Sequence, residues 1–389
     1  MQTARRFDHI RESVIREMTR LAIKHDAINL SQGFPDFDPP PEVVQAAVAA
    51  IQNGLNQYTI TWGYPPLREK LAEIYTERLG WQVEADEHIV VTCGVTEALA
   101  AAMLAVLNPG DEIIIFDPAH ETFRPGAVLA DARPVSVVLR SPDFRIEREA
   151  LEAAITPRTK ALILNTPHNP SGRVFEPDEI AAVVDVVTRH DLILITDEIY
   201  DRILYDGRVH VSPGSLEPLR DRTITIGGFG KTYAMTGWRL GYAIAPSRLA
   251  RAVKPAHDFL TICAATPLQA AALAALNLPE AFYEQQRTEY HQRRALMTEI
   301  LQDIGFRFHI PEGAYYILAD YRTLPIPQAA WDADRFARWM TTEIGVAVVP
   351  GPNFYANPAD GEGLIRFAYP KKLETLHAAA QRMARLKGT

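Results

Sequence analysis

The sequence is poor in cysteine and has no long apolar stretch. Only Cys93 and Cys263 occur among 389 residues, too few for a disulfide framework, which favours a reducing compartment. No apolar run approaches the roughly 18–20 residues of a membrane span. The first 25 residues mix both charge signs and lack the apolar core of a signal peptide. We therefore expect a cytoplasmic protein that has no membrane partner.

The charge balance and one missing motif argue against two further classes of protein, those that bind nucleic acid and those that use a nicotinamide cofactor. Forty basic residues stand against 48 acidic ones, and the net charge of −8 argues against nucleic acid as a partner. No G-x-G-x-x-G fingerprint follows a strand pattern, which argues against a nicotinamide-dependent dehydrogenase. We predict no metal site. The length of 389 residues exceeds one typical core, so at least two domains are expected.

Short apolar runs alternate with helical patterns through most of the chain. Such alternation is typical of an α/β domain whose mostly parallel sheet is covered on both faces. The expected strands are residues 88–92, 112–117, 134–139, 159–164, 192–196, 223–226 and 238–245. The expected helices are residues 8–25, a helix opening at 42, a helix ending near 78, and residues 97–107, 147–155 and 178–190.

The pattern changes beyond residue 285. A charged helix over 291–303 and a helix near 332–344 are expected among the short extended segments GAYYILAD, VAVVP and LIRFAY. This mixture predicts a smaller α+β domain. We assign residues 45–285 to the large domain. Residues 1–44, as an N-terminal arm, and 286–389 are assigned to the small domain.

The most informative stretch is residues 223–242. A β-branched apolar run empties into a glycine-rich turn, where backbone can approach a ligand closely. Lys231 follows, flanked by Phe229 and Tyr233, and desolvation there can make its amine nucleophilic. Arg239 then offers a planar charged fork suited to a phosphate. The alternative is a plain surface loop carrying an ordinary lysine and arginine.

Polar residues gather where the predicted strands end. Ligands bind beyond the carboxyl ends of the strands in such sheets, and the residues found there are Asn165, Asn169, Asp197, Tyr200 and Lys231. A strand, a glycine turn and a helix start also meet at residues 92–97, where free backbone N–H groups can bind an anion. These positions together predict one site at the edge of the sheet.

Four motifs in this order carry a family resemblance: SQGFPDF, NTPHNPSG, DEIY and GFGKTYAMTGWRLGY. From about Ile28 onward the chain resembles the fold-type-I, pyridoxal-phosphate-dependent aminotransferases of class I. It is most similar to the kynurenine, glutamine–phenylpyruvate and methionine aminotransferase group. The resemblance implies a three-layer α/β/α large domain, pyridoxal 5'-phosphate as cofactor, and a homodimer with shared active sites.

The resemblance also implies roles for single residues. Lys231 would bind the cofactor as a Schiff base and then move a proton. Asp197 would keep the cofactor ring nitrogen protonated, and Asn169 and Tyr200 would donate hydrogen bonds to the ring oxygen. Arg366 would hold the substrate carboxylate as a bidentate fork. The close backbone approach of Gly33 would serve the same carboxylate, and Asn165 would lie at the cofactor.

The phosphate would be bound by several groups. These are Gly94, the backbone N–H of Val95 and Thr96, the Thr96 hydroxyl and Arg239. Tyr58 would reach the phosphate from the other subunit of the dimer, although a buried core tyrosine is its alternative role.

Two positions depart from the family pattern. His120 stands where an aromatic ring usually stacks on the cofactor; neutral imidazole can stack too, but it can also gain a proton near neutral pH. Gly228 stands where a phosphate-binding serine is common, so one hydrogen bond is missing or made by water. Either departure can be family drift, or His120 can mark an unusual substrate or reaction.

The predicted function is transfer of an α-amino group from an L-amino acid to a 2-oxo acid by a ping-pong mechanism. A neutral substrate such as glutamine, methionine or an aromatic amino acid is favoured, because no second arginine is clearly placed for a side-chain carboxylate. Arg124 and Arg173 are the candidates for that second arginine. A C–S β-lyase, or another specialised reaction on an amino acid, would use the same residues. A non-catalytic binding protein is a third reading, opposed by the presence of Lys231.

Overall fold

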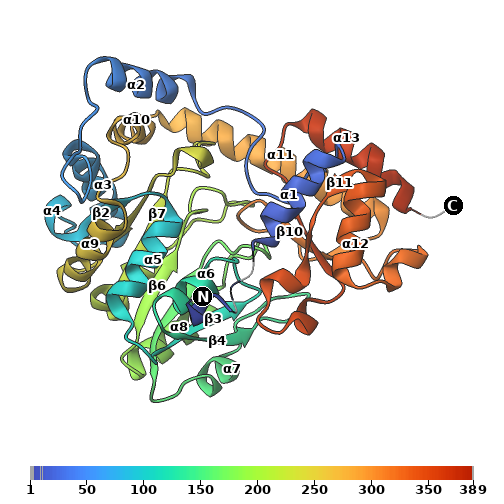
Figure 1. Ribbon diagram of the computed structural model, residues 1–389, viewed down its shortest axis with the longest axis horizontal. Coiled ribbons are helices and arrows are strands. Elements are labelled where there is room, and N and C mark those ends of the chain that lie inside the picture. Colours follow the sequence, from blue (N-terminus) through green and yellow to red (C-terminus); the bar gives the residue numbers. More distant parts are fainter. Residues whose placement is uncertain (1–3, 9, 11, 388–389) are drawn as a thin grey trace.

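The computed structural model describes residues 4–8, 10 and 12–387. Parts of the predictions for the N-terminal arm and the C-terminus fall on residues 1–3, 9, 11 and 388–389, which lie outside the described residues. A large sheet with its helices forms one side of the molecule, and the C-terminal third packs together with α1 on the other (Figure 1).

The large sheet has seven strands in the order β2-β8-β7-β6-β5-β3-β4. Their bounds are Ile89–Thr92 (β2), Glu112–Asp117 (β3), Arg133–Val138 (β4), Thr159–Asn165 (β5), Ile193–Asp197 (β6), Thr223–Gly228 (β7) and Gly241–Ile244 (β8). Only β8 runs antiparallel to its neighbours β2 and β7. No α-helix lies between β7 and β8 to form the crossover that a parallel pair needs. The predicted mostly parallel sheet is confirmed.

Helices cover both faces of this sheet. Successive residues of β3 point to opposite faces, so that Ile113 and Ile115 pack in one core and Ile114 and Phe116 in the other. One core is closed by α5 (Val95–Val106), α6 (Phe123–Leu129) and α9 (Ser247–Thr261). The other is closed by α7 (Arg148–Ala153) and α8 (Pro177–Arg189). This is the predicted three-layer α/β/α arrangement.

Three further helices form a separate buried cluster at the edge where β2 lies. These are α2 (Pro41–Gln52), α3 (Pro65–Leu79) and α10 (Thr266–Leu276); the short α4 (Ala85–His88) leads into β2. None of the described helices combines the length and the apolarity that crossing a membrane requires.

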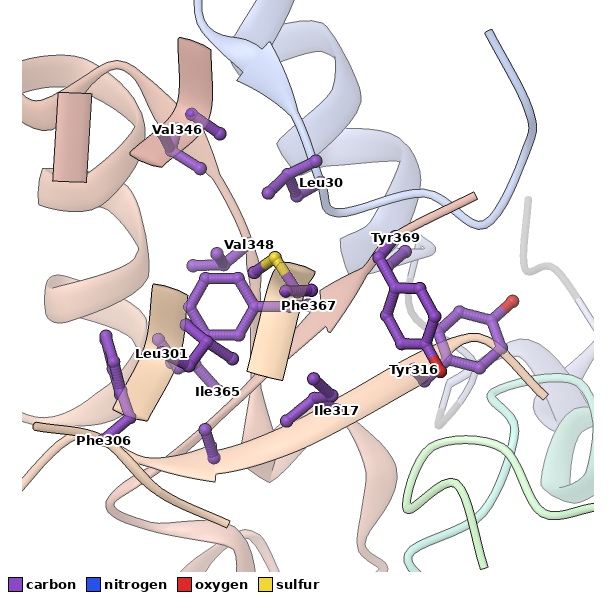
Figure 2. Close-up of a cluster of buried hydrophobic side chains, with 14 of the residues drawn as sticks. Leu30, Leu301, Phe306, Tyr316, Ile317, Val346, Val348, Ile365, Phe367 and Tyr369 are labelled. Atoms are coloured by element: carbon purple, nitrogen blue, oxygen red, sulfur yellow. The ribbon is translucent and has the colours of Figure 1, made fainter. Parts of the chain in front are cut away.

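The C-terminal part contains a four-stranded antiparallel sheet in the order β12-β13-β10-β9. The strands are Arg307–Phe308 (β9), Tyr316–Asp320 (β10), Val349–Pro350 (β12) and Leu364–Ala368 (β13), and α13 (Leu373–Met383) packs nearby. Near the N-terminus, α1 (Val14–Lys24) leads to β1 (Ile28–Asn29), which pairs with β11 (Val346–Ala347). Figure 2 shows Leu30 in the same core as Val346 and Phe367.

Joining the N-terminal arm to the C-terminal part is consistent with the predicted domains, but their boundaries stay a prediction. The helix expected over 291–303 is longer, because α11 (Glu280–Ile304) starts directly after Pro279 and crosses the boundary placed at 285. The helix expected near 332–344 divides into α12 (Ala333–Trp339) and a π-helical turn (Met340–Ile344). The helix expected over 8–25 begins only at Val14, where the Ser13 side chain caps it.

Glycine at position 241 is required by a close backbone crossing. A Cβ atom there would lie 2.6 Å from both the Gly94 carbonyl carbon and the Val95 nitrogen. We predict that Gly241→Ala lowers the free energy of unfolding by about 1–3 kcal/mol, since backbone must shift to admit the methyl group. Gly237→Ala is the control, because a Cβ at Gly237 meets nothing within 4 Å. Urea unfolding measures both, and equal stabilities would contradict the prediction.

Candidate active site

One cavity of about 420 Å³ lies beyond the carboxyl ends of the central strands. It is lined by every predicted site residue except Asn165 and Tyr58, namely Gly33, Gly94, Val95, Thr96, His120, Asn169, Asp197, Tyr200, Lys231, Arg239 and Arg366. A larger groove of about 870 Å³ lies between α8 and residues 208–218 and contains none of them. The residues predicted to form one site therefore lie together around one cavity, and their roles stay a prediction.

Lys231 lines the cavity, and a hydrogen bond holds its amine in place. It follows the glycines that end β7 and donates a hydrogen bond of 2.8 Å to the Gly33 carbonyl oxygen. The Tyr315 hydroxyl donates to the same oxygen at 3.1 Å. A Cβ on Gly33 would lie 2.0 Å from the Tyr316 hydroxyl, so only glycine brings this carbonyl group to the lysine. The close backbone approach expected at Gly33 therefore brings its carbonyl oxygen to the Lys231 amine, and Gly33 also lines the cavity.

Asp197 stands at the end of β6 and is 5% exposed. Burial raises the pKa of its carboxyl to about 7, against the backbone N–H of Ile199 and the charge of Lys231, which lower it. The carboxylate therefore lacks a close cationic partner of its own. A cationic N–H group placed in the cavity would restore the charged form.

Two asparagines, Asn165 and Asn169, lie at and after the end of β5. Asn165 donates from its side chain to the Asp197 carbonyl oxygen at 2.9 Å and accepts from the Asn169 backbone at 2.8 Å. It does not line the cavity, so its predicted contact with the cofactor is replaced by a supporting position behind Asn169. Asn169 faces the cavity, and so does Tyr200, whose hydroxyl lies 2.9 Å from that of Tyr316.

Arg366 carries a buried charge that no acidic side chain of the described residues contacts. On β13 it is 1% exposed, and its guanidinium donates to Asn169 Oδ1 at 3.0 Å and to the Ser31 carbonyl oxygen at 2.6 Å. The Tyr316 ring lies 4.5 Å from the guanidinium carbon. No carboxylate of the described residues lies within 4.0 Å of it, and its Nε has no partner there. Such a group is suited to an anion, above all a carboxylate.

An anion cradle forms at the start of α5. The N–H groups in the first turn of a helix have no partner within the helix, and at α5 they belong to Val95 and Thr96. Gly94 has a φ of +86°, and a Cβ on it would lie 2.5 Å from the Arg239 guanidinium. Arg239 itself has a left-handed φ of 55°. This arrangement joins a helix N-terminus with a charged fork, as a phosphate requires.

Tyr58 lies apart from its own cavity. Its side chain is 76% exposed, which makes the alternative of a buried core tyrosine wrong. It belongs to the loop after α2, whose Gln57 carbonyl oxygen accepts a hydrogen bond from Thr266.

Three polar side chains that line the cavity were not predicted: Arg16, Glu121 and Tyr316. The Tyr316 ring is tilted against that of Tyr315, with the centroids 4.9 Å apart. The doubled tyrosine in GAYYILAD was the one available sequence signal. By contrast, the candidates Arg124 and Arg173 are paired with Asp117 and Glu179 and do not line the cavity. Within the described ranges, no group of three or more His, Cys, Asp or Glu side chains is arranged to hold a metal ion.

Comparisons with known proteins agree with this geometry. Residues 25–383 match the family model described as aminotransferase class I and II. The chain belongs to this family. It is 37% identical over 375 residues to the methionine aminotransferase of Escherichia coli K12, covering 96% of each chain. It is 35% identical to kynurenine–oxoglutarate transaminase 1 of Mus musculus, covering 99% of this chain and 98% of that protein.

Solved structures show the same fold. The N-succinyldiaminopimelate aminotransferase from Mycobacterium tuberculosis superposes with a TM-score of 0.94 at 35% identity, over 99% of this chain and 100% of the other. The fold of this aminotransferase is therefore the fold type I of pyridoxal-phosphate enzymes, and the predicted family and enzyme class are confirmed.

Both departures of this aminotransferase from the family pattern have physical explanations. Burial, followed by the charges of Arg366 and Lys231, lowers the pKa of His120 to about 3. The ring is thus neutral at physiological pH, and the expectation that it can gain a proton near neutrality is corrected. At Gly228, a Cβ would lie 2.9 Å from both Ile199 Cδ1 and Val95 Cγ2. A serine there has no room unless its neighbours move.

A neutral His120 gives a testable pH dependence. Because its pKa is depressed, the imidazole stays unprotonated from about pH 5 to 8, where an unperturbed histidine titrates. His120→Phe should therefore leave the shape of the pH–rate profile unchanged in this range, while His120→Tyr tests whether an aromatic hydroxyl alters substrate preference. Steady-state rates against pH measure both. An acidic limb in the parent that disappears in His120→Phe would show that His120 titrates.

The same depressed pKa affects stability with a definite sign. The unfolded chain binds a proton on His120 near pH 6.5 that the folded chain does not, so this residue lowers stability as the pH falls. His120→Phe should accordingly flatten the acid side of the stability curve, which urea unfolding at several pH values measures.

Proposed function

We propose that this aminotransferase uses pyridoxal 5'-phosphate to move the α-amino group of a neutral L-amino acid to a 2-oxo acid in a ping-pong cycle. One observation carries the proposal. Lys231, Asp197 and Arg366 face the same cavity, and none of the three has an opposite charge of its own in close contact among the described residues. An amine, a carboxylate and a guanidinium so placed are complementary to a cofactor and an amino acid bound together.

The residues present fit that cofactor. The Lys231 amine is placed to bond its aldehyde carbon, and Asp197 to accept from its ring nitrogen. Tyr200 and Asn169 face the same cavity and can donate to its ring oxygen. The cradle at Gly94–Thr96 with Arg239 fits its phosphate. When bound, the cofactor supplies the electron sink that makes the substrate α-proton acidic.

The remaining chemistry falls to the protein. Arg366 would orient the substrate by its carboxylate, since its Nε has no partner in the described part of the chain. The Lys231 amine lines the same cavity and would serve as the base that takes the α-proton and returns it to the cofactor carbon. The Gly33 carbonyl oxygen accepts from this amine, and the rings of Tyr200 and Tyr315, whose centroids lie 6.0 and 5.8 Å from Lys231 Nζ, flank it.

The rest of the cavity lining is compatible with a neutral substrate side chain. Ile15 and Phe34 give it apolar surface, while Arg16 and Glu121 bring one charge of each sign. Glu121 accepts from the Ser13 hydroxyl and lies 3.5 Å from the Asn353 amide nitrogen. The names of the relatives include methionine and kynurenine, which agrees with substrates such as methionine, glutamine or an aromatic amino acid.

We further propose a homodimer with shared active sites. Exposed apolar side chains follow one another over α2, the loop after it and the end of α9, where Phe259 is 92% exposed. They are Val44, Val48, Ile51, Tyr58, Ile60, Phe259, Leu260 and Ile262. Exposed apolar surface of this kind is typical of an interface. In that dimer Tyr58 would reach the phosphate bound by the other subunit.

The deciding experiment follows the visible spectrum of the cofactor-loaded protein while single L-amino acids are added without any oxo acid. Aminotransfer predicts that the yellow band is lost with the best donor and returns when a 2-oxo acid is added. Lys231→Ala is the control and should show neither change. A yellow band that persists while ammonia and an oxo acid accumulate would establish the C–S β-lyase alternative, which needs the same residues.

A further inference from the structure

His257 lies in α9, 0% exposed, between two hydrogen-bond acceptors. Its Nδ1 is 2.7 Å from Glu97 Oε1, and its Nε2 is 2.8 Å from the Thr61 carbonyl oxygen. A carbonyl oxygen and a carboxylate oxygen only accept, so both ring nitrogens must carry a proton to satisfy them. The geometry therefore describes an imidazolium bound to a carboxylate.

The two acceptors belong to different parts of the proposed phosphate site. Glu97 lies in the first turn of α5, and its second oxygen accepts the Cys93 N–H at 2.5 Å, one residue before the cradle at Gly94. Thr61 belongs to the loop that carries Tyr58. The next residue of this loop, Trp62, accepts the Val91 N–H of β2 at 2.9 Å. One buried ring thus joins the cradle to the loop.

The groups around the His257 ring determine the direction in which its pKa shifts. Burial lowers the pKa of His257, but the hydrogen bond and charge of Glu97, the Thr61 carbonyl and the charge of Asp258 outweigh it, so the pKa is raised. The Thr261 hydroxyl also approaches Nδ1 at 3.3 Å. Lys254, one turn earlier on α9, is directed instead at the carbonyl oxygens of Asp86 and Glu87.

We propose that His257 is a positioning residue that clamps the phosphate cradle of α5 and the loop carrying Tyr58 into one unit. Only the identity of the phosphate and the reach of Tyr58 to the partner rest on the proposed function. If both hold, His257 connects the phosphate cradle of one active site to the loop that serves the active site of the other subunit. Loss of its hydrogen bonds would then make both segments more mobile.

The clamp has a defined pH dependence. A histidine whose pKa is raised by folding binds its proton more tightly in the folded protein. Its contribution to stability is therefore complete below about pH 6.5, the ordinary pKa of histidine. It is lost as the pH rises through the folded pKa, because neutral imidazole can donate to only one of the two acceptors.

Amide hydrogen exchange of the full-length, cofactor-loaded protein tests the clamp without measuring turnover. Two amides report on its two sides: Cys93, which donates to Glu97, and Gly63, which donates to the Ile60 carbonyl in the loop. At about pH 6, His257→Gln should exchange both amides at least about tenfold faster than the parent, since one charge-assisted hydrogen bond is lost. Across a series of increasing pH values, after correction for intrinsic rates, the parent should lose protection of both amides as His257 loses its proton, whereas the variant should show no such pH dependence.

His190→Gln is the matched control. The His190 ring also pairs with a glutamate, Glu152, at 2.7 Å, but it lies directly after α8, away from both segments. In this variant the amide hydrogens of Cys93 and Gly63 should exchange at the same rates as in the parent. Unchanged exchange at Gly63 in His257→Gln, or a pH dependence that survives in that variant, would overturn the clamp.

A second variant covers the case in which His257→Gln does not fold. Glu97→Gln keeps an acceptor for Nδ1 but removes the charge, so the pH at which Gly63 loses protection should shift downward. An unshifted midpoint would overturn the clamp as well. If the protein binds no pyridoxal 5'-phosphate, the proposed function fails, whereas the same exchange measured without cofactor still tests His257.

Discussion

The buried guanidinium of Arg366 is the contact on which the assembly of this site depends. It is carried by β13 in the C-terminal part, donates to Ser31 in the N-terminal arm and to Asn169 at the end of the central sheet. Three segments far apart in the chain therefore meet at one charge. Burying that charge without a carboxylate is costly, and the cost is offset when an anionic ligand binds. The buried guanidinium therefore makes the site complementary to an anionic ligand.

Glycine makes the rest of the geometry possible. Gly33 brings its carbonyl oxygen to the Lys231 amine because no side chain separates it from Tyr316. Gly94 lies against the Arg239 guanidinium, and Gly241 crosses the backbone of the cradle. Each position places backbone where a side chain would collide. The cavity is thus formed by close backbone approach at a rigid sheet edge.

Much of this arrangement could be predicted from the sequence. The apolar runs identified the strands, and polar residues at their ends, such as Asp197 and Lys231, lie together because parallel strands end at one edge. The antiparallel direction of β8 could not be predicted, because it depends on a turn without a helix. The supporting role of Asn165, and the lining residues Arg16 and Glu121, depend on contacts between distant segments that no local pattern reports.

The two departures from the family pattern, Gly228 and His120, are both accommodated by their buried surroundings. Val95 and Ile199 fill the space that a side chain at Gly228 would need, so a serine would require these neighbours to move. His120 remains an aromatic ring without charge, since burial disfavours its protonation. Lys231, Asp197 and Arg366 line the same cavity as His120.

The central claim is that Lys231 is the amine that bonds the cofactor. A second lysine offers a strict comparison, because burial lowers the pKa of Lys371 to about 8 and its amine donates to the Phe34 carbonyl at 2.7 Å, near the same loop as Gly33. Borohydride reduction of the cofactor-loaded protein, followed by peptide mapping, distinguishes the two. The account predicts a phosphopyridoxyl group on Lys231 alone. A label on Lys371 or another lysine, or no stable label, would contradict it.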